Sequence, residues 1–291
     1  MIHRLIKIIS LFHRSIYKIK LVQNLLFKSQ GRECVKLLND VKLNIQTGDL
    51  ISNYIFHFGI WEPEITRYIY RSIEKLSGRS FIDIGANIGY FSILVAKNNA
   101  DAMVYCYEPL PKSYQLLISN IKLNKISNID ARPWAISDQN GELKIYEGHQ
   151  MNIGNSGIFD EQKTGNYHKT NSVQLLDEII KMKFPPKIIK IDTEGSESKI
   201  LFQIEMVVEK LPQDIEFIIE VNPNLIGKER ANEILKRFIS MGFTAYQIKN
   251  SYKIESYLLE YEEKIHQKIE KIEGQTDILF TKNSNQLIKY N

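Results

Sequence analysis

Short apolar runs alternate with amphipathic stretches from residue 80 onward, and this alternation predicts strands separated by helices. The expected strands cover residues 81–84, 103–107, 129–136, 187–191, 217–221, 244–248 and 277–281. The expected helices cover about 88–97, 112–124 and 228–241, with a fourth beginning near 196. Helices of this length between strands favour a mostly parallel sheet covered on both faces, which is an α/β fold.

Two segments interrupt the alternation. Residues 146–171 are rich in Gly and Asn and indicate a long exposed loop, which is often functional. Residues 254–272 carry apolar side chains at helical spacing with Glu and Lys between them, which predicts an amphipathic helix inserted before the last strand.

The first 28 residues have a helical pattern of their own. Apolar side chains recur every three or four positions, at Ile2, Leu5, Ile9, Phe12, Ile16 and Ile19. This predicts a basic amphipathic helix, because the segment holds six Lys and Arg and no Asp or Glu. Two alternatives are open: the helix packs on the rest of the protein, or it lies on an anionic membrane surface.

Composition narrows the classes of function. The chain has 38 Lys and Arg, of which six lie in residues 1–28. Residues 29–291 therefore hold 32 basic and 34 acidic side chains. A segment with this balance lacks the positive charge of a nucleic-acid-binding protein. Cys34 and Cys106 are the only cysteines, which excludes a disulfide scaffold and a CxxC metal clip. We therefore expect a cytoplasmic protein, peripheral at the inner face of the membrane if the N-terminal helix binds there.

The strongest local motif is the segment 81–90, FIDIGANIGY. An apolar strand runs into a small-residue turn and then a helix, so the glycines allow a ligand to approach the helix amides closely. Asp83 ends the strand, where it can accept a hydrogen bond from a ligand ammonium or from the loop. Gly85 and Gly89 form G-x-x-x-G instead of the dinucleotide fingerprint, which favours a ligand without a pyrophosphate.

Acidic residues follow the next strands of the predicted sheet. Glu108 comes 23 residues after Gly85, near the spacing of a ribose-binding acid, so the two motifs together predict a nucleoside-containing cofactor. Asp192 and Glu194 follow the strand at 187–191, and Glu220 lies in the next one. Such carboxylates can orient a substrate, act as a general base or cap a helix. A metal ion shared by Asp192, Glu194 and Glu220 stays open, although no His or Cys spacing supports zinc and we assign no metal ligand.

The segments 83–91, 107–109 and 190–197 resemble the FkbM-type S-adenosylmethionine-dependent methyltransferases. Further similarity at 59–62, 120–124, 135–138 and 176–177 extends the resemblance over roughly residues 48–282. It implies a class I methyltransferase fold, which is Rossmann-like, with a seven-stranded sheet and one antiparallel strand near an edge. We therefore expect a methyltransferase domain over 48–291, preceded by the basic helix and a lead-in over 1–47.

The resemblance also assigns roles to individual residues. The amino-acid part of S-adenosylmethionine would be surrounded by Asp83, Gly85, Ala86, Asn87 and Gly89. Glu108 would bind the ribose, and Glu62 would join the cofactor-binding residues from the segment 59–62. The turn with Ala135, Ser137 and Asp138 would lie beside the adenine.

Asp192 and Glu194 would face the methyl group or the substrate, and family members are linked to O-methylation of sugars or secondary metabolites. An alcohol loses its proton during methylation, so a nearby base is needed. Asp192 is the first choice, Glu194 the second, and His149 and His168 in the predicted loop are the remaining candidates. The expected function is therefore methylation of a hydroxyl on a glycan or small metabolite. The alternatives are a nicotinamide-dependent oxidoreductase and a non-catalytic, cofactor-binding assembly protein at a membrane.

Overall fold

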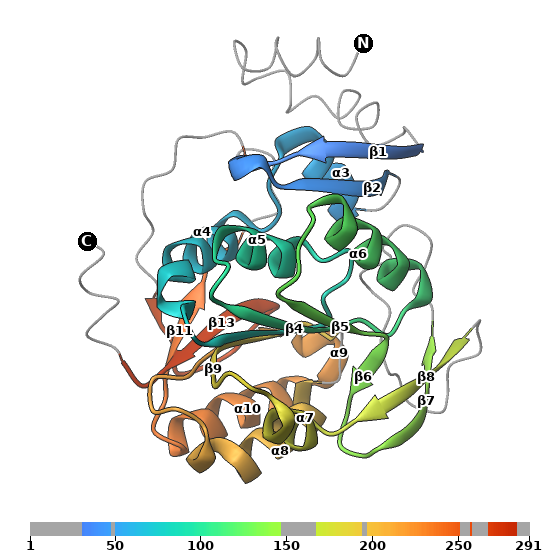
Figure 1. Ribbon diagram of the computed structural model, residues 1–291. Coiled ribbons are helices and arrows are strands. Elements are labelled where there is room, and N and C mark those ends of the chain that lie inside the picture. Colours follow the sequence, from blue (N-terminus) through green and yellow to red (C-terminus); the bar gives the residue numbers. More distant parts are fainter. Residues whose placement is uncertain are drawn as a thin grey trace.

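One large sheet forms the centre of the protein (Figure 1). The computed structural model describes residues 31–47, 50–146, 167–193, 197–250, 257 and 267–283. The sheet has eight strands in the order β12-β11-β13-β10-β9-β3-β4-β5. In chain order they are β3 (Ser80–Ile84), β4 (Met103–Tyr107), β5 (Ile129–Arg132), β9 (Pro186–Ile191), β10 (Glu216–Val221), β11 (Thr244–Ile248), β12 (Gln267–Lys268) and β13 (Thr276–Thr281).

The order of these strands determines where a ligand can bind. The strands from β10 to β5 are parallel, and β13 runs antiparallel to both of its neighbours. The chain proceeds from β3 to β4 and β5 on one side, then returns to β9 and β10 on the other, so the carboxyl end of β3 is a topological switch point. The predicted class I methyltransferase fold is confirmed, except that the two-residue β12 gives the sheet an eighth strand.

Helices cover both faces of the sheet (Figure 1). One layer contains α4 (Pro63–Ser72), α5 (Tyr90–Asn98) and α6 (Pro111–Leu123), and the other contains α7 (Leu175–Lys181), α8 (Glu197–Val207) and α10 (Lys228–Ser240). α3 (Leu50–Phe58) and the short α9 (Pro223–Ile226) are the other α-helices of the described residues, beside short 3-10 turns at Leu38–Asp40, Ile73–Leu76 and Val208–Lys210. Ile69 and Ile93 pack with Phe81 on the first face, and Ile204 and Phe238 pack with Phe217 on the second. The four helices expected in the sequence are confirmed as α5, α6, α8 and α10.

The expected single strand over 129–136 is wrong. It divides into β5 and β6 (Trp134–Ile136), because Pro133 lacks the amide hydrogen that a continuous ladder would need. β6 leaves the large sheet and joins β7 (Gly141–Tyr146) and β8 (Tyr167–Val173) in a three-stranded sheet of order β6-β8-β7. Both ends of the expected loop at 146–171 therefore lie in strands, while residues 147–166 lie outside the described part.

The expected helix over 254–272 is wrong at its carboxyl end, where Gln267–Lys268 forms β12 against β11. Of its earlier residues only Tyr257, which is helical, is described. The predicted helix over 1–28 lies wholly outside the described residues. Within the part of the chain that the structure describes, no helix combines the length and hydrophobicity needed to span a bilayer.

A β-hairpin that the sequence reasoning did not find precedes α3. Its strands are β1 (Gly31–Lys36) and β2 (Lys42–Thr47); β2 packs against α6, and its Leu43 and Ile45 are fully buried. The side chain of Asn120 accepts a hydrogen bond from the amide of Asn44 (2.6 Å) and donates to the carbonyl of Asn44 (3.1 Å). The same amide group donates to the carbonyl of Ile88 (3.0 Å), so Asn120 connects the hairpin to the turn before α5.

Candidate functional site

The turn between β3 and α5 lies at the switch point of the sheet. Gly85 has a left-handed φ of 84°, and a Cβ on it would lie 1.8 Å from the carbonyl oxygen of Asp192. Only glycine permits this approach of two backbones. The amides of Gly85 and Ala86 both donate to the carbonyl of Tyr107 at 3.0 Å, and Asn87 is also left-handed, with φ 51°. The turn is therefore fixed between β4 and the segment that follows β9.

The first turn of α5 is held equally closely. Gly89 has a φ of 86°, and a Cβ on it would lie 2.4 Å from Cδ1 of Leu117 on α6. Asp83 is buried beneath this turn, where its Oδ2 accepts a hydrogen bond from the Ser92 hydroxyl (2.6 Å). Its Oδ1 has no hydrogen-bond partner among the described residues, and burial raises the pKa of Asp83. A buried acceptor at this position suits a ligand that brings a donor.

Glu108 reaches the glycine turn from the end of β4, as the sequence predicts. The carboxyl group is buried, Oε2 accepts the amide of Asn87 (2.8 Å), and Oε1 accepts the amide of Leu110 (2.8 Å). Burial raises the pKa of Glu108 to about 7, although the two amide hydrogen bonds favour the ionised form. Each oxygen keeps lone-pair capacity for a further donor, such as a ligand hydroxyl.

Asp192 lies beside the same turn. Its amide donates to the carbonyl of Ile84 (3.0 Å), and its Oδ2 accepts a hydrogen bond from Nζ of Lys190 (2.8 Å). Burial alone would raise the pKa of Asp192, but the Lys190 ammonium and a hydrogen bond with Glu220 hold it below its usual range. Lys190 is itself only 3% exposed, with Nζ 5.0 Å from the centre of the Phe91 ring. Asp192 is therefore an ionised carboxylate with a fixed counter-ion.

Two more carboxyl groups lie next to Asp192, at the same edge of the sheet. Glu220 of β10 is directly opposite Asp277 of β13, and Nδ2 of Asn250 donates to Oδ2 of Asp277 (2.7 Å). Burial is the main reason that the pKa of Glu220 rises to about 11 and that of Asp277 to about 7, and the charge of Asp192 adds to both.

Sequence reasoning missed Lys190 and Asp277. The signal for Lys190 is its position two residues before Asp192, because alternate residues of a strand share a face. Asp277 is the second residue of the antiparallel strand β13, and the start of that strand meets the carboxyl ends of the parallel ones. Glu62, whose role had come from the family resemblance, precedes α4 with a left-handed φ of 41° and is 3% exposed. Its charge acts on Lys190 and Glu220, so it belongs to the same cluster.

The other residues predicted to act in the site lie away from this cluster or outside the residues that the structure describes. Glu194 and His149 lie outside the described residues, and His168 lies on β8 in the smaller sheet. In the turn predicted to lie beside adenine, Ala135 and Ser137 are buried.

The Ser137 hydroxyl donates to Oδ1 of Asp138 (2.9 Å), which lies 4.0 Å from Nζ of Lys199. The adenine-binding role of this turn stays a prediction. Among the described residues no three His, Cys, Asp or Glu are arranged to hold a metal ion.

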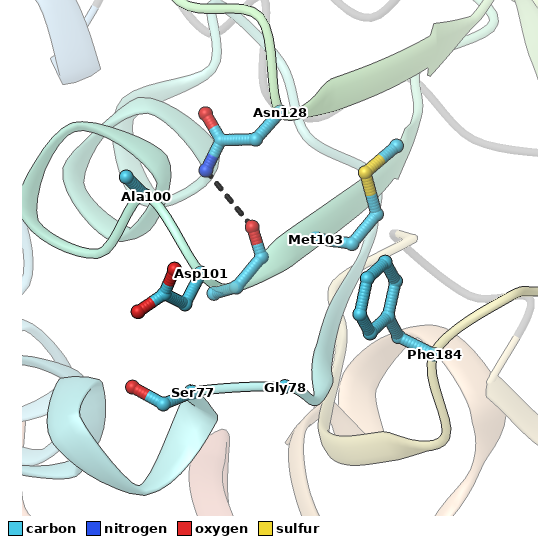
Figure 2. Close-up of a pocket in the computed structure, with 8 residues that line it drawn as sticks. Ser77, Gly78, Ala100, Asp101, Met103, Asn128 and Phe184 are labelled. Carbon is cyan, nitrogen blue, oxygen red and sulfur yellow. Dashed lines mark hydrogen bonds between the residues drawn. The ribbon is translucent and has the colours of Figure 1, made fainter.

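A separate cleft of about 480 Å³ opens at the amino ends of β3 and β4 (Figure 2). Gly78, Asp101 and Phe184 line it, and Asn128 donates across it to the carbonyl of Ala102 (2.9 Å). This is the edge of the sheet opposite to Asp83 and Glu108, so the cleft is not part of the candidate site.

Comparison with known proteins adds a family and distant relatives. The family described as Vibrio cholerae RfbT protein matches residues 37–276. Methyltransferase 1 of Beauveria bassiana is 24% identical over 141 residues, which are 41% of this chain and 56% of that protein. The tRNA(Phe) (4-demethylwyosine(37)-C(7)) aminocarboxypropyltransferase of Methanocaldococcus jannaschii is 30% identical over 115 residues, which are 35% of this chain and 45% of that protein.

The match thus spans about half the length of these two relatives. Among solved structures, the O-methyltransferase from Bacillus cereus in complex with SAH has 14% identity and a TM-score of 0.44, over 76% of this chain and 81% of that one. The matched family is RfbT, so the closer resemblance to FkbM-type enzymes stays a prediction.

Proposed function

The chain belongs to the Vibrio cholerae RfbT protein family, and from this premise we propose that it is an S-adenosylmethionine-dependent methyltransferase. The acceptor that we propose is a hydroxyl group on a glycan or a small secondary metabolite. The FkbM-type motifs at 83–91, 107–109 and 190–197 support this assignment, and so does the methyltransferase among the relatives.

The observation that carries the proposal is the position of Glu108 against the glycine turn. Its carboxyl group touches the amide of Asn87, and Asp83 lies below the turn with one buried oxygen open to a donor. S-adenosylmethionine offers matching donors, namely an ammonium group and two ribose hydroxyls. The residues present therefore fit this cofactor, with Glu108 holding the ribose and the turn at 83–89 holding the amino-acid part.

Methyl transfer requires placement and removal of one proton. When bound, the cofactor supplies an electrophilic methyl group on a sulfonium, and the acceptor oxygen must approach in line with the carbon–sulfur bond. We assign Asp192 to receive the hydroxyl proton, because its backbone touches Gly85 and its carboxylate is ionised at neutral pH. Glu194 is the second candidate for this role.

Calorimetry with S-adenosylmethionine tests the cofactor assignment. Glu108→Ala should weaken binding by roughly 1.5–3 kcal/mol, the usual range for hydrogen bonds to a charged group. Glu142→Ala is the matched control, since this carboxylate is 59% exposed on β7 and pairs with Lys169. Unchanged affinity in a folded Glu108→Ala protein would remove Glu108 from the site.

Transfer of an isotope-labelled methyl group to a panel of hydroxylated glycans and metabolites tests the reaction. Asp192→Asn keeps the shape but removes the proton acceptor, so turnover should fall by about 10²–10⁴-fold while the cofactor still binds. Normal turnover in this variant would pass the role to Glu194. Cofactor binding without transfer to any acceptor would favour the assembly-protein alternative, and binding of a nicotinamide cofactor would favour the oxidoreductase.

A further inference from the structure

Three neighbouring strands each bring a carboxyl group to the same edge of the sheet. Ile219 of β10 is in register with Ile191 of β9, so the residues that follow them, Glu220 and Asp192, are neighbours. Glu220 is in turn paired with Asp277 across the antiparallel ladder. The result is a continuous row of three acids, which we call the acidic row: Asp192 directly after β9, Glu220 on β10 and Asp277 on β13.

A single ammonium group among the described residues meets this row. Lys190 is in register with Asp83 on β3 and with Ile218 on β10, two residues before Glu220, so its side chain shares their face of the sheet. Its Nζ is 2.8 Å from Oδ2 of Asp192, and the side chain of Lys190 is almost fully buried.

The number of nearby charges limits how many of the three carboxyl groups can be ionised. Asp277 is buried and Asp192 and Glu220 are partly buried, so these neighbouring carboxylates repel each other with reduced screening, and ionisation of all three beside one ammonium is unfavourable. Lys190 contacts Asp192 directly, which makes Asp192 the carboxylate of the row. Glu220 then keeps its proton and shares it with Asp192, in agreement with the pKa of about 11 for Glu220.

We propose that Lys190 and Glu220 are positioning residues that hold Asp192 as an oriented carboxylate, Lys190 through its ammonium group and Glu220 through a hydrogen bond from a neutral carboxylic acid. Other titratable groups that face this unit are Glu62 before α4, Asp83 on β3, Glu108 after β4 and Asp277 on β13. The catalytic role of Lys190, Asp192 and Glu220 rests on the proposed function, but the protonation states of these three residues do not depend on it.

In the proposed reaction the unit fixes the destination of one proton. The acceptor oxygen forms a bond to the methyl carbon, the electron pair of the carbon–sulfur bond stays on sulfur, and the hydroxyl proton passes to Asp192. Two donors on Asp192 weaken it as a base but keep it ionised and in place, so that it accepts a hydrogen bond from the hydroxyl throughout the approach.

Difference infrared spectroscopy of the full chain at pH 7 tests the distribution of protons without cofactor or acceptor. Glu220→Gln should remove the C=O stretching band of one protonated carboxyl group. Lys190→Met should add such a band from Asp192, which disappears in the double variant Lys190→Met/Asp192→Asn, and Lys190→Arg should restore the original spectrum. A wild-type spectrum without a Glu220-dependent band, or a Lys190→Met spectrum without an Asp192-dependent band, overturns the proposal.

Lys187→Met is the matched control, because Lys187 is equally buried on β9 but lies at the opposite end, 3.5 Å from Glu216. It should produce no band that depends on Asp192. Circular dichroism shows whether Lys190→Met folds. If it does not, the Glu220→Gln variant, which keeps Lys190, still tests whether Glu220 is protonated at pH 7.

Once an acceptor is known, kcat of Lys190→Met at pH 7 should fall at least about 10-fold and recover at higher pH, with little change in cofactor affinity. If the wild-type protein does not bind S-adenosylmethionine, the proposed function fails, while the infrared result still decides the role of Lys190 and Glu220.

Discussion

Replacing Glu108 by Gln should change how the stability of the protein depends on pH. The carboxyl group is buried, and its pKa is raised from an ordinary 4.5 to about 7. The folded state therefore binds a proton more tightly than the unfolded state does. As the pH rises from about 4.5 to about 7.5, the unfolded chain gives up this proton first, so Glu108 makes the folded state progressively less favourable.

The size of the effect follows from the two pKa values. At about 1.4 kcal/mol per pH unit, the gap between 4.5 and about 7 corresponds to roughly 3 kcal/mol of unfolding free energy. Below pH 4.5 both states are protonated and the contribution vanishes. Glu108→Gln has the same shape and cannot ionise, so wild type should lose roughly 3 kcal/mol relative to this variant between pH 4.5 and 8.

Urea unfolding at several pH values measures this difference directly. Asp277→Asn provides the comparison, because burial also raises the pKa of Asp277 to about 7 and the sign is the same. Parallel stability curves for wild type and Glu108→Gln from pH 4.5 to 8 would refute the reasoning. In the proposed function, ribose hydroxyls donate to the ionised carboxylate, so cofactor binding at pH 7 should release about half a proton per molecule, which calorimetry in buffers of different ionisation enthalpy detects.

Three further predictions concern other parts of the chain. Gly85→Ala should abolish cofactor binding or folding, because its Cβ would overlap the carbonyl of Asp192, whereas Gly78→Ala, with φ 69° and open space around it, should lose only about 1–2 kcal/mol in thermal unfolding. Asn120→Ala removes bonds to the hairpin and should cost about 1–3 kcal/mol, with faster hydrogen exchange in residues 42–47 as the diagnostic. Residues 1–28 should bind anionic vesicles at low salt with about 1 kcal/mol per basic side chain, and co-sedimentation that survives their deletion would contradict this.

Local patterns predicted most of the central sheet, because β3, β4, β9, β10 and β13 are short and mostly apolar runs. The strand at 103–107 was predicted at its observed bounds, and the glycine turn was predicted from Gly85 and Gly89, which both have the positive φ that favours glycine. Its contact with Glu108 follows from the rule that parallel strands end at the same edge.

Elements that depend on partners distant in the sequence were missed. The hairpin strand β1 is mostly exposed and carries little hydrophobic pattern, and its partner β2 is recognised only by what it packs against on α6. β7 and β8 carry many polar residues, so β7 was not predicted as a strand and most of β8 fell within the loop predicted over 146–171. The raised pKa of Glu220 had no signal in the sequence, because it depends on burial and on Asp192 and Asp277 meeting it in space.

The contact between Gly85 and the carbonyl of Asp192 has a consequence for protein engineering. The proposed cofactor turn and the segment that carries the proposed base meet backbone to backbone, with no side chain between them that could adjust to a new partner. A chimera that takes one of the two segments from a relative inherits its backbone path and must match the other segment to within a fraction of an ångström. New acceptor specificity is therefore better sought by exchanging surface residues that frame the site than by transplanting either motif alone.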